Sequence, residues 1–200
     1  MKKVNHSKFL ASLAFALLTS VAVFAQGYKL GDKVEGFSLK NASNQEVKLS
    51  DYAKSKVVAV IFTNTQCAYS KLYENRLVNL ARAYANQGVQ FIFINPSIGT
   101  GDGSETLQDL AAKKYSFPYL ADEGQKVSSR FGATKTPEAF VLQNNNGAFV
   151  LKYKGAIDDN AQVETDVKDY YLKKVIDEVL ANKTVTVLQS RPTGCMIRRY

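Results

Sequence analysis

Two cysteines, Cys67 and Cys195, are the side chains in this 200-residue sequence whose type and placement best suit chemistry. Cys67 follows a polar turn and, before it, six apolar residues at 57–62 with the composition of a strand buried on both faces. After Cys67 the apolar residues recur with the spacing of an amphipathic helix: Tyr73, Leu77, Leu80 and Tyr84. The free N–H groups and the dipole of a helix N-terminus favour a thiolate. The pattern therefore predicts a redox-active thiol at Cys67, with half of a permanent disulfide or a small buried apolar residue as the alternatives.

Other kinds of catalytic site have little support. The single histidine, His6, lies in an N-terminal segment that we expect to be removed, which excludes Ser-His-Asp catalysis, Cys-His catalysis and histidine-ligated metals from the rest of the chain. Two cysteines are too few for a structural zinc site. The Gly-rich loop at 99–103 lacks the Lys-Ser/Thr of a phosphate-binding loop. We therefore expect neither a metal nor a cofactor.

Residues 1–25 have the pattern of a secretory signal peptide. A basic start is followed by an apolar run at 9–24 and by the small residues Val23 and Ala25 that suit a signal peptidase. An uncleaved membrane anchor is the alternative, but the run falls short of the ~20 residues that span a bilayer comfortably. We expect cleavage after Ala25, a periplasmic or secreted protein, and one domain at 26–200.

The charge of the chain suggests a solvated surface. Without Lys2, Lys3 and Lys8 of the signal segment, 23 basic residues face 18 acidic ones, and the two kinds are dispersed and often alternate. This distribution predicts no nucleic-acid partner, and no membrane association once the signal is cleaved. An exported chain meets an oxidising compartment, where two cysteines most often form one disulfide.

The hydrophobic patterns predict a central sheet flanked by helices. The strands and helices are expected, in chain order, as a hairpin at 37–39 and 46–49, a strand at 57–62, a helix from Cys67 to about Gln87, a strand at 89–94, a helix at 105–115, a short helix at 123–131, a hairpin at 139–142 and 148–153, and a helix at 163–180.

Motifs in this order carry a resemblance to a known family. They include Gln66-Cys67-Ala68-Tyr69-Ser70, Thr136-Pro137 before a hairpin, and Gly194-Cys195 near the end. Together, residues 30–200 resemble a thioredoxin-like redoxin of the peroxiredoxin-like branch of the alkyl hydroperoxide reductase/thiol-specific antioxidant superfamily. The resemblance implies an α/β thioredoxin-like fold with a central mixed β-sheet, an N-terminal β-hairpin and a C-terminal tail. It also implies that Pro137 is a cis proline that helps to dock a partner.

The sequence departs from the family pattern at three positions. Ser70 stands where thioredoxins have the second cysteine of Cys-x-x-Cys, and a hydroxyl cannot form a disulfide. Val60 and Asn64 stand where peroxidatic relatives have a proline and a threonine that shape the peroxide pocket. Cys195 is therefore the only candidate to resolve an intermediate on Cys67.

The role of Cys195 stays open between a resolving partner and a structural staple. A bond closing a loop of roughly 130 residues stabilises a fold by about 4–5 kcal/mol in the chain-entropy model, so energetics alone do not decide. The neighbouring arginines, Arg191, Arg198 and Arg199, either favour its thiolate or form an exposed basic tail.

We expect an exported thiol-disulfide oxidoreductase that acts on a protein or small-thiol partner. Cys67 and Cys195 are the expected catalytic residues, and Ser70, Thr136 and Pro137 the expected substrate-binding residues. One alternative is a thiol-dependent peroxidase, in which peroxide oxidises Cys67 to a sulfenic acid. The other is a redox-silent binding module stapled by a Cys67–Cys195 disulfide. The oligomeric state is left open.

Overall fold

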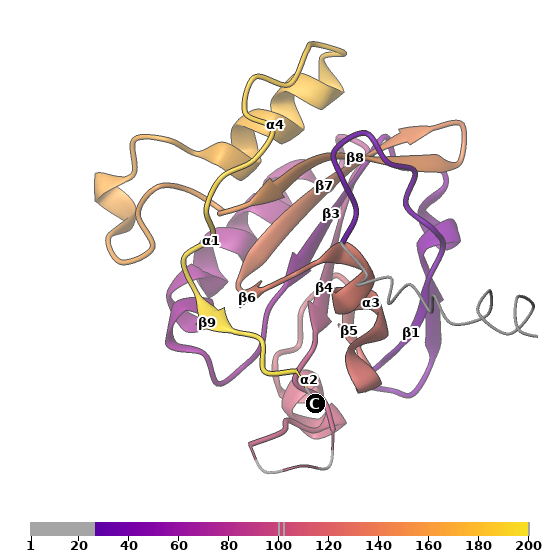
Figure 1. Cartoon of the computed structure of the whole chain (residues 1–200), viewed down its shortest axis with the longest axis vertical. Coiled ribbons are helices and arrows are strands. Elements are labelled where there is room, and N and C mark those ends of the chain that lie inside the picture. Colours follow the sequence, from indigo (N-terminus) through magenta and orange to yellow (C-terminus); the bar gives the residue numbers. More distant parts are fainter. Residues whose placement is uncertain (1–26, 100, 102, 200) are drawn as a thin grey trace, which may run out of the picture.

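The computed structural model describes residues 27–99, 101 and 103–199, so the expected signal segment lies outside the described part of the chain. Seven strands form one mixed sheet: β1 (Ser38–Asn41), β2 (Glu46–Lys48), β3 (Val57–Phe62), β4 (Val89–Asn95), β5 (Tyr119–Ala121), β7 (Glu138–Asn145) and β8 (Ala148–Gly155). Their order across the sheet is β2-β1-β5-β4-β3-β7-β8 (Figure 1). Two short strands, β6 (Lys135–Thr136) and β9 (Cys195–Met196), pair separately. The expected central sheet and N-terminal hairpin are confirmed.

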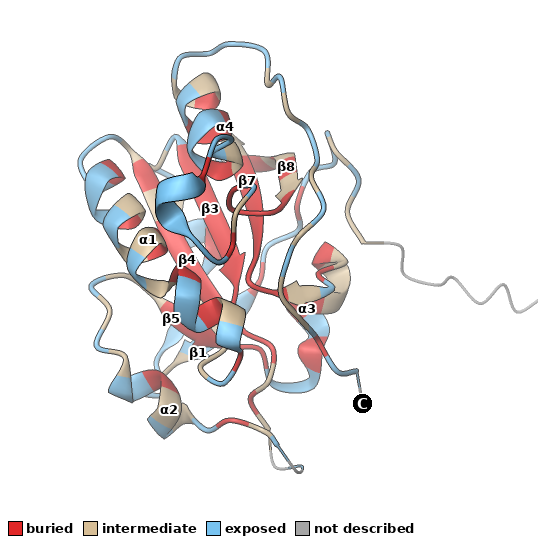
Figure 2. Ribbon diagram, turned by 90° about the vertical axis from the view of Figure 1, so that its left-hand side faces the viewer, coloured by how far each residue is buried: buried red, intermediate tan, exposed pale blue. Residues whose placement is uncertain are grey.

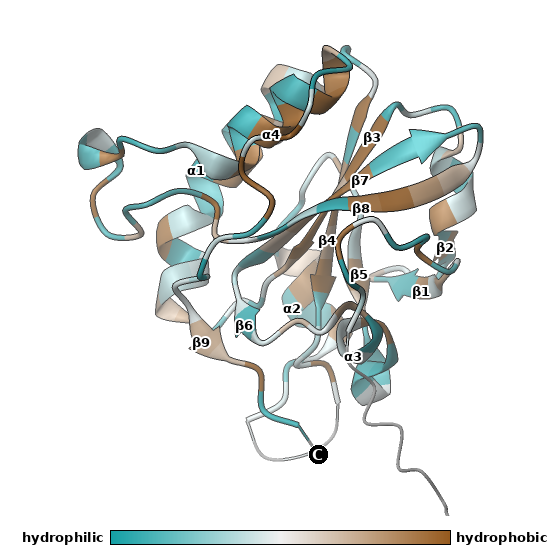
Figure 3. Cartoon of the chain, turned by 45° about the horizontal axis from the view of Figure 1, so that its top comes forward, coloured by the Kyte–Doolittle hydropathy of each residue, from teal (hydrophilic) through white to brown (hydrophobic). Residues whose placement is uncertain are grey.

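The middle strand, β3, is fully buried, as its apolar run predicts. It runs parallel to β4 and antiparallel to β7. Because side chains alternate along a strand, its odd-numbered residues face one core cluster and its even-numbered residues the other. Figure 3 shows the central strands as the most hydrophobic part of the sheet. The last residue of β3, Phe62, pairs with Glu138 at the start of β7, which brings the loop before Cys67 close to Pro137.

Helices cover both faces of the sheet (Figure 2). On one face, α1 (Ala68–Tyr84) and α4 (Tyr171–Leu180) bury apolar residues that include Leu77 and Ile176. On the other, α3 (Lys126–Phe131) places Phe131 against Phe62 and Phe140. The remaining helix is α2 (Leu107–Ala112), and three short 3-10 turns are η2 (Leu49–Tyr52), η3 (Glu123–Gln125) and η4 (Glu164–Asp166).

The helix expected at 163–180 was wrong in its first half. The structure has η4 and an irregular segment there, and α4 begins only at Tyr171. Side chains before this segment bind its backbone: Asp159 Oδ1 accepts the N–H of Lys168 at 3.0 Å, and Asn160 Oδ1 accepts that of Val163 at 2.9 Å. Such bonds compete with the backbone hydrogen bonds of a helix. The segment is therefore not helical, although its apolar residues have helical spacing.

The helix expected at 105–115 is shorter, at Leu107–Ala112. Glu105 turns into the interior instead of starting the helix, and Thr106 forms a capping box with Asp109. Within residues 27–99, 101 and 103–199, no helix has the length and apolar character needed to span a membrane.

Candidate disulfide site

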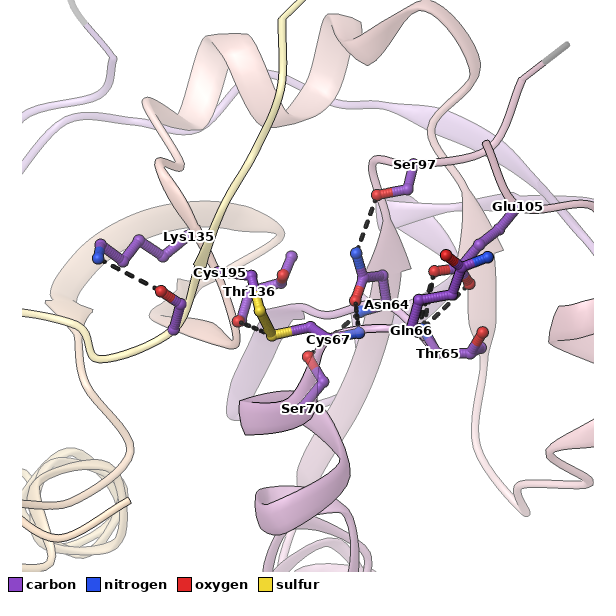
Figure 4. The surroundings of a disulfide bond; sticks show 11 residues. Asn64, Thr65, Gln66, Cys67, Ser70, Ser97, Glu105, Lys135, Thr136 and Cys195 are labelled. Carbon is purple, nitrogen blue, oxygen red and sulfur yellow. Dashed lines mark hydrogen bonds between the residues drawn. A yellow bond between two sulfur atoms is a disulfide. The ribbon is translucent and has the colours of Figure 1, made fainter. Parts of the chain in front are cut away.

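Cys67 and Cys195 are joined by a disulfide between the start of α1 and β9 (Figure 4). Their Cα atoms lie 5.9 Å apart, within the range that a disulfide bridges, although 128 residues separate them in sequence. The expected pairing of the two cysteines is therefore confirmed as a contact. Cys67 is 5% exposed, whereas Cys195 is partly exposed.

Cys67 occupies the position just before the first turn of α1. Its backbone is extended, with φ −66° and ψ 126°, and its carbonyl accepts the N–H of Lys71 at 3.1 Å. Its side chain makes no capping hydrogen bond. The sulfur thus lies at the N-terminus of a 17-residue helix, where backbone N–H groups favour negative charge.

Asn64 organises the loop that leads into α1. Its Oδ1 accepts the N–H of Cys67 at 2.9 Å, and its Nδ2 donates to Ser97 Oγ at 3.0 Å (Figure 4). The sequence reasoning treated Asn64 only as a missing threonine. An asparagine in a polar turn often binds a backbone N–H a few residues further on, and this tendency could have revealed the role.

Ser70 is directed toward the same loop. Its side chain is buried, and its Oγ lies 3.5 Å from the N–H of Asn64. The structure therefore places this expected substrate-binding residue beneath the loop, on the first turn of α1.

Glu105 is a buried carboxylate that the sequence reasoning missed. It is 1% exposed and accepts the N–H groups of Thr65 at 3.0 Å and Gln66 at 3.2 Å, together with the Asn95 side-chain amide at 2.9 Å. Burial and, secondly, the charge of Glu105 raise the pKa of nearby Tyr119 well above its ordinary value. Glu105 thus holds the loop before Cys67 from a position 40 residues away in sequence.

The Thr136–Pro137 peptide bond is cis, as expected. The carbonyl oxygen of Thr136 lies 3.1 Å from Cys67 Sγ, a close contact that becomes a possible hydrogen bond only when the sulfur carries a proton. Thr136 Oγ1 is buried and has no hydrogen-bond partner among the described residues. Both expected docking residues therefore lie beside the sulfur but are buried in the oxidised state.

The C-terminal tail covers the edge of β6. Thr136 pairs with Cys195 and Lys135 with Met196 in an antiparallel ladder. Gly194 permits this approach, because a Cβ atom there would lie 2.4 Å from the carbonyl oxygen of Thr136. The chain's own tail therefore occupies the backbone edge next to Pro137, where the resemblance implied that a partner docks.

A hollow of about 440 Å³ adjoins the disulfide. It is lined by Asn64, Gln66, Cys67, Ser97, Gly103, Ser104, Gln125, Cys195, Met196 and Arg198. Both cysteines contribute to its wall, so a small thiol or a side chain of a larger partner can approach the sulfurs from this side.

The acidic pair Asp158-Asp159 does not form a cation site within the described residues, where no group of three metal-ligating side chains occurs. Asp158 is buried and forms an ion pair with Arg76 at 2.9 Å. It also accepts the hydroxyl of Tyr73 at 2.6 Å, and burial with this hydrogen bond raises the pKa of Tyr73. These groups join α1 to the loop after β8 and lie apart from the disulfide site.

Comparisons with known proteins place these features in context. The sequence model of the AhpC/TSA family matches residues 30–160. "Glutathione peroxidase 1" of Caenorhabditis elegans is 29% identical over 166 residues, covering 75% of this chain and 98% of that protein.

Solved structures show the same architecture. A hypothetical protein of Sinorhizobium meliloti is 30% identical with a TM-score of 0.78, covering 87% of this chain and 96% of that one. The exposed lipoprotein thioredoxin of Streptococcus pneumoniae is 20% identical with a TM-score of 0.52, covering 74% and 99%. At that identity the likeness shows the fold alone. The expected thioredoxin-like fold is confirmed.

Proposed function

The chain belongs to the AhpC/TSA family, and from this premise we propose that it is an exported thiol-disulfide oxidoreductase. The family makes it an oxidoreductase of the redoxin type that acts on protein or thiol partners. The observation that carries the finer proposal is the disulfide between Cys67, at the N-terminus of α1, and Cys195, in the tail. Ser70 occupies the position of a local resolving cysteine, so Cys195 takes that role.

The proposed cycle has two exchange steps. In the first, the Cys67 thiolate attacks a disulfide of the partner, and one partner sulfur leaves as a thiolate. In the second, the Cys195 thiolate attacks Cys67 Sγ, forms the Cys67–Cys195 bond and releases the second partner thiolate. The partner disulfide gains two electrons, and the two cysteines of this protein lose them. Thiols of a second partner return the protein to its reduced form.

The surroundings of Cys67 support its role as the attacking and leaving thiolate. The N–H groups at the start of α1 favour negative charge on the sulfur, and a stabilised thiolate is a better leaving group in thiol exchange. Asn64 and Glu105 hold the preceding loop through hydrogen bonds to its N–H groups, so the sulfur is kept in one place. Pro137 and Thr136 are proposed to contribute to partner docking when β9 moves from the edge of β6.

A peroxidase is the second candidate, favoured by the likeness to a protein named glutathione peroxidase. Two features argue against efficient peroxide chemistry. Val60 is fully buried in β3, and both ends of the Asn64 amide are engaged, with Cys67 and with Ser97. Neither residue presents a group that would hold a peroxide against the thiolate, so thiol-disulfide exchange is the preferred activity.

Mixed-disulfide trapping tests the proposed exchange. Cys195→Ser should accumulate partners bound to Cys67, because the second step is blocked, and Cys67→Ser should trap none by this route. The trapped species are separated without reductant and counted by mass after alkylation of free thiols.

A parallel measurement tests the remaining alternative, a redox-silent binding module. The purified wild-type protein is equilibrated with graded glutathione buffers, and its free thiols are alkylated and counted by mass. A disulfide that stays closed in strongly reducing buffer, together with an empty Cys195→Ser trap, would establish the bond as a structural staple.

A further inference from the structure

Arg199, four residues after Cys195, is bound to the end of α3 and not to the disulfide. Its Nη1 donates to Ser128 Oγ at 2.9 Å and to Ser129 Oγ at 3.1 Å, and its Nη2 donates to the carbonyl of Ala133 at 2.5 Å. Ser128 is fully buried, so this attachment is made to a fixed part of the core. A planar guanidinium that satisfies three acceptors is held in one orientation. We call Arg199 with these three acceptors the Arg199 clamp.

Two further contacts hold the neighbouring residues of the tail. The N–H of Ile197 donates to the carbonyl of Thr134 at 2.9 Å, and the Ile197 side chain is buried in the core cluster that also contains Phe131. The amide of Gln125 donates to the carbonyl of Arg198 at 2.7 Å. None of these contacts involves a sulfur atom. Residues 197–199 are therefore attached to the body of the protein independently of the disulfide.

We propose that Arg199 is a positioning residue that keeps Cys195 beside Cys67 in the reduced protein as well as in the oxidised one. When the disulfide opens, the Arg199 clamp remains, so residues 197–199 stay attached and keep Cys195 near Cys67 even when β9 separates from β6 to admit a partner. The effective concentration of the Cys195 thiol at Cys67 is then high, since the chain has little conformational freedom left to lose when the bond re-forms.

The consequence for turnover, rapid resolution of an intermediate on Cys67, rests on the proposed function. The thermodynamic consequence, a more stable disulfide, does not rest on the proposed function. A tethered cysteine raises the equilibrium constant for disulfide formation against glutathione, whether or not the protein has a natural partner.

The chain offers a matched control for a test of this clamp. Arg191 lies four residues before Cys195, as Arg199 lies four residues after it, and has no side-chain hydrogen bond or ion pair within the described residues. Arg199→Ala and Arg191→Ala remove the same charge from the same tail. A difference between them therefore reports the clamp and not the charge.

The first measurement is the equilibrium of each protein with graded glutathione buffers. We expect Arg199→Ala to lower the equilibrium constant for the disulfide about ten-fold, which corresponds to a reduction potential about 30 mV less negative. Arg191→Ala should leave the constant unchanged. Arg199→Lys should recover part of the loss, because an ammonium group reaches some of the same acceptors but lacks the planar fork. Equal constants for wild type, Arg199→Ala and Arg191→Ala would overturn the proposal.

The second measurement needs no substitution. Amide hydrogen exchange of the reduced wild-type protein should show the N–H of Ile197 still protected, as in the oxidised protein. Fast exchange of this amide on reduction would overturn the proposal even if Arg199→Ala failed to fold.

Neither measurement requires turnover. If a protein that traps no partner shows both effects, the clamp is supported and the proposed function is not. Partner trapping without either effect would support the proposed function and rule out the clamp.

Discussion

Cys67 and Cys195 differ in what surrounds each sulfur. Cys67 is buried at a helix N-terminus, with its N–H bound by Asn64 and its sulfur against the carbonyl of Thr136. Cys195 is partly exposed on a short edge strand. The start of α1 favours a thiolate at Cys67, whereas burial and the carbonyl oxygen of Thr136 oppose it. The position of Cys195 depends instead on the contacts that hold the tail.

Oxidation by hydrogen peroxide is the first prediction at this scale. We expect the second-order rate for Cys67 in reduced Cys195→Ser to be no higher than for an ordinary thiol of the same pKa. The physical reason is that Val60 is buried and the Asn64 amide is already engaged, so peroxide gains no dedicated hydrogen bonds. The rate is measured by stopped-flow mixing, with Cys67→Ser as the blank. A rate orders of magnitude above that of the reference thiol would make the peroxidase the better assignment.

The two elements that meet at the site, the start of α1 and the cis turn before β7, are each fixed by a buried carboxylate. Glu105 binds the loop before α1, and Glu138 binds the turn: its Oε2 accepts the N–H of Thr134 at 2.7 Å and that of Lys135 at 3.0 Å. Burial raises the pKa of Glu138 above its ordinary value of 4.5, although these hydrogen bonds oppose the shift. Burying each carboxylate costs solvation free energy, and each carboxylate holds one side of the disulfide in position.

Glu138→Gln isolates the charge of this residue, because one amide oxygen can accept the same hydrogen bonds. A folded-state pKa above the unfolded value means that the native protein binds the proton more tightly. The resulting stability is present below pH 4.5 and is lost as the pH rises through the folded pKa. We therefore expect the free energy of unfolding of wild type to fall relative to that of Glu138→Gln as the pH rises above 4.5.

Urea unfolding of both proteins at a series of pH values between about 4 and 7 measures this difference. A difference that does not change with pH would show that Glu138 has the same pKa in the folded and unfolded states.

For the whole molecule, the disulfide closes a loop that contains the four α-helices and more than half of the strands. Its cysteines are 128 residues apart, and the loop includes α1 through α4 and the strands from β4 to β8, whereas β1, β2 and β3 precede it. The tail thus returns from α4, past β8, to the opposite end of the sheet, where it pairs with β6 (Figure 1).

Opening this loop should lower the free energy of unfolding by about 4 kcal/mol, since the disulfide limits the conformations of the unfolded chain. Cys195→Ser is the suitable variant, because Cys195 is partly exposed and its change creates less of a core defect than a change at buried Cys67. Urea unfolding of oxidised wild type and of the variant gives the difference. A loss below about 1 kcal/mol would mean that the unfolded chain gains little freedom when the loop opens.

Export remains a prediction from residues 1–25. The mature protein should begin at Gln26, since the basic start, the short apolar run and the Val23/Ala25 pair fit signal peptidase. Mass analysis of the N-terminus of the native protein, recovered from its cell fraction, tests this. Recovery of an intact segment from Met1 to Ala25 in a membrane fraction would contradict it.

The features that rest on local patterns could be predicted from the amino-acid sequence alone. The apolar run at β3 and the helical spacing after Cys67 predicted a cysteine between a buried strand and a helix, because each pattern is contained within about 20 residues. Local periodicity also misled at 163–170, where hydrogen bonds from Asp159 and Asn160 outweighed the helical spacing. The pattern records which residues are apolar but not which backbone groups side chains will bind.

The contacts that hold the site together depend on the three-dimensional fold. Glu105 reaches the loop before Cys67 from 40 residues away, β9 covers β6, and Arg199 binds the end of α3. In sequence, Glu105 was the first residue of an expected helix, and Arg199 was one of three arginines near a cysteine. Their partners lie far along the chain, and such contacts have no local periodicity. They are fixed only when the sheet brings the distant segments to one edge.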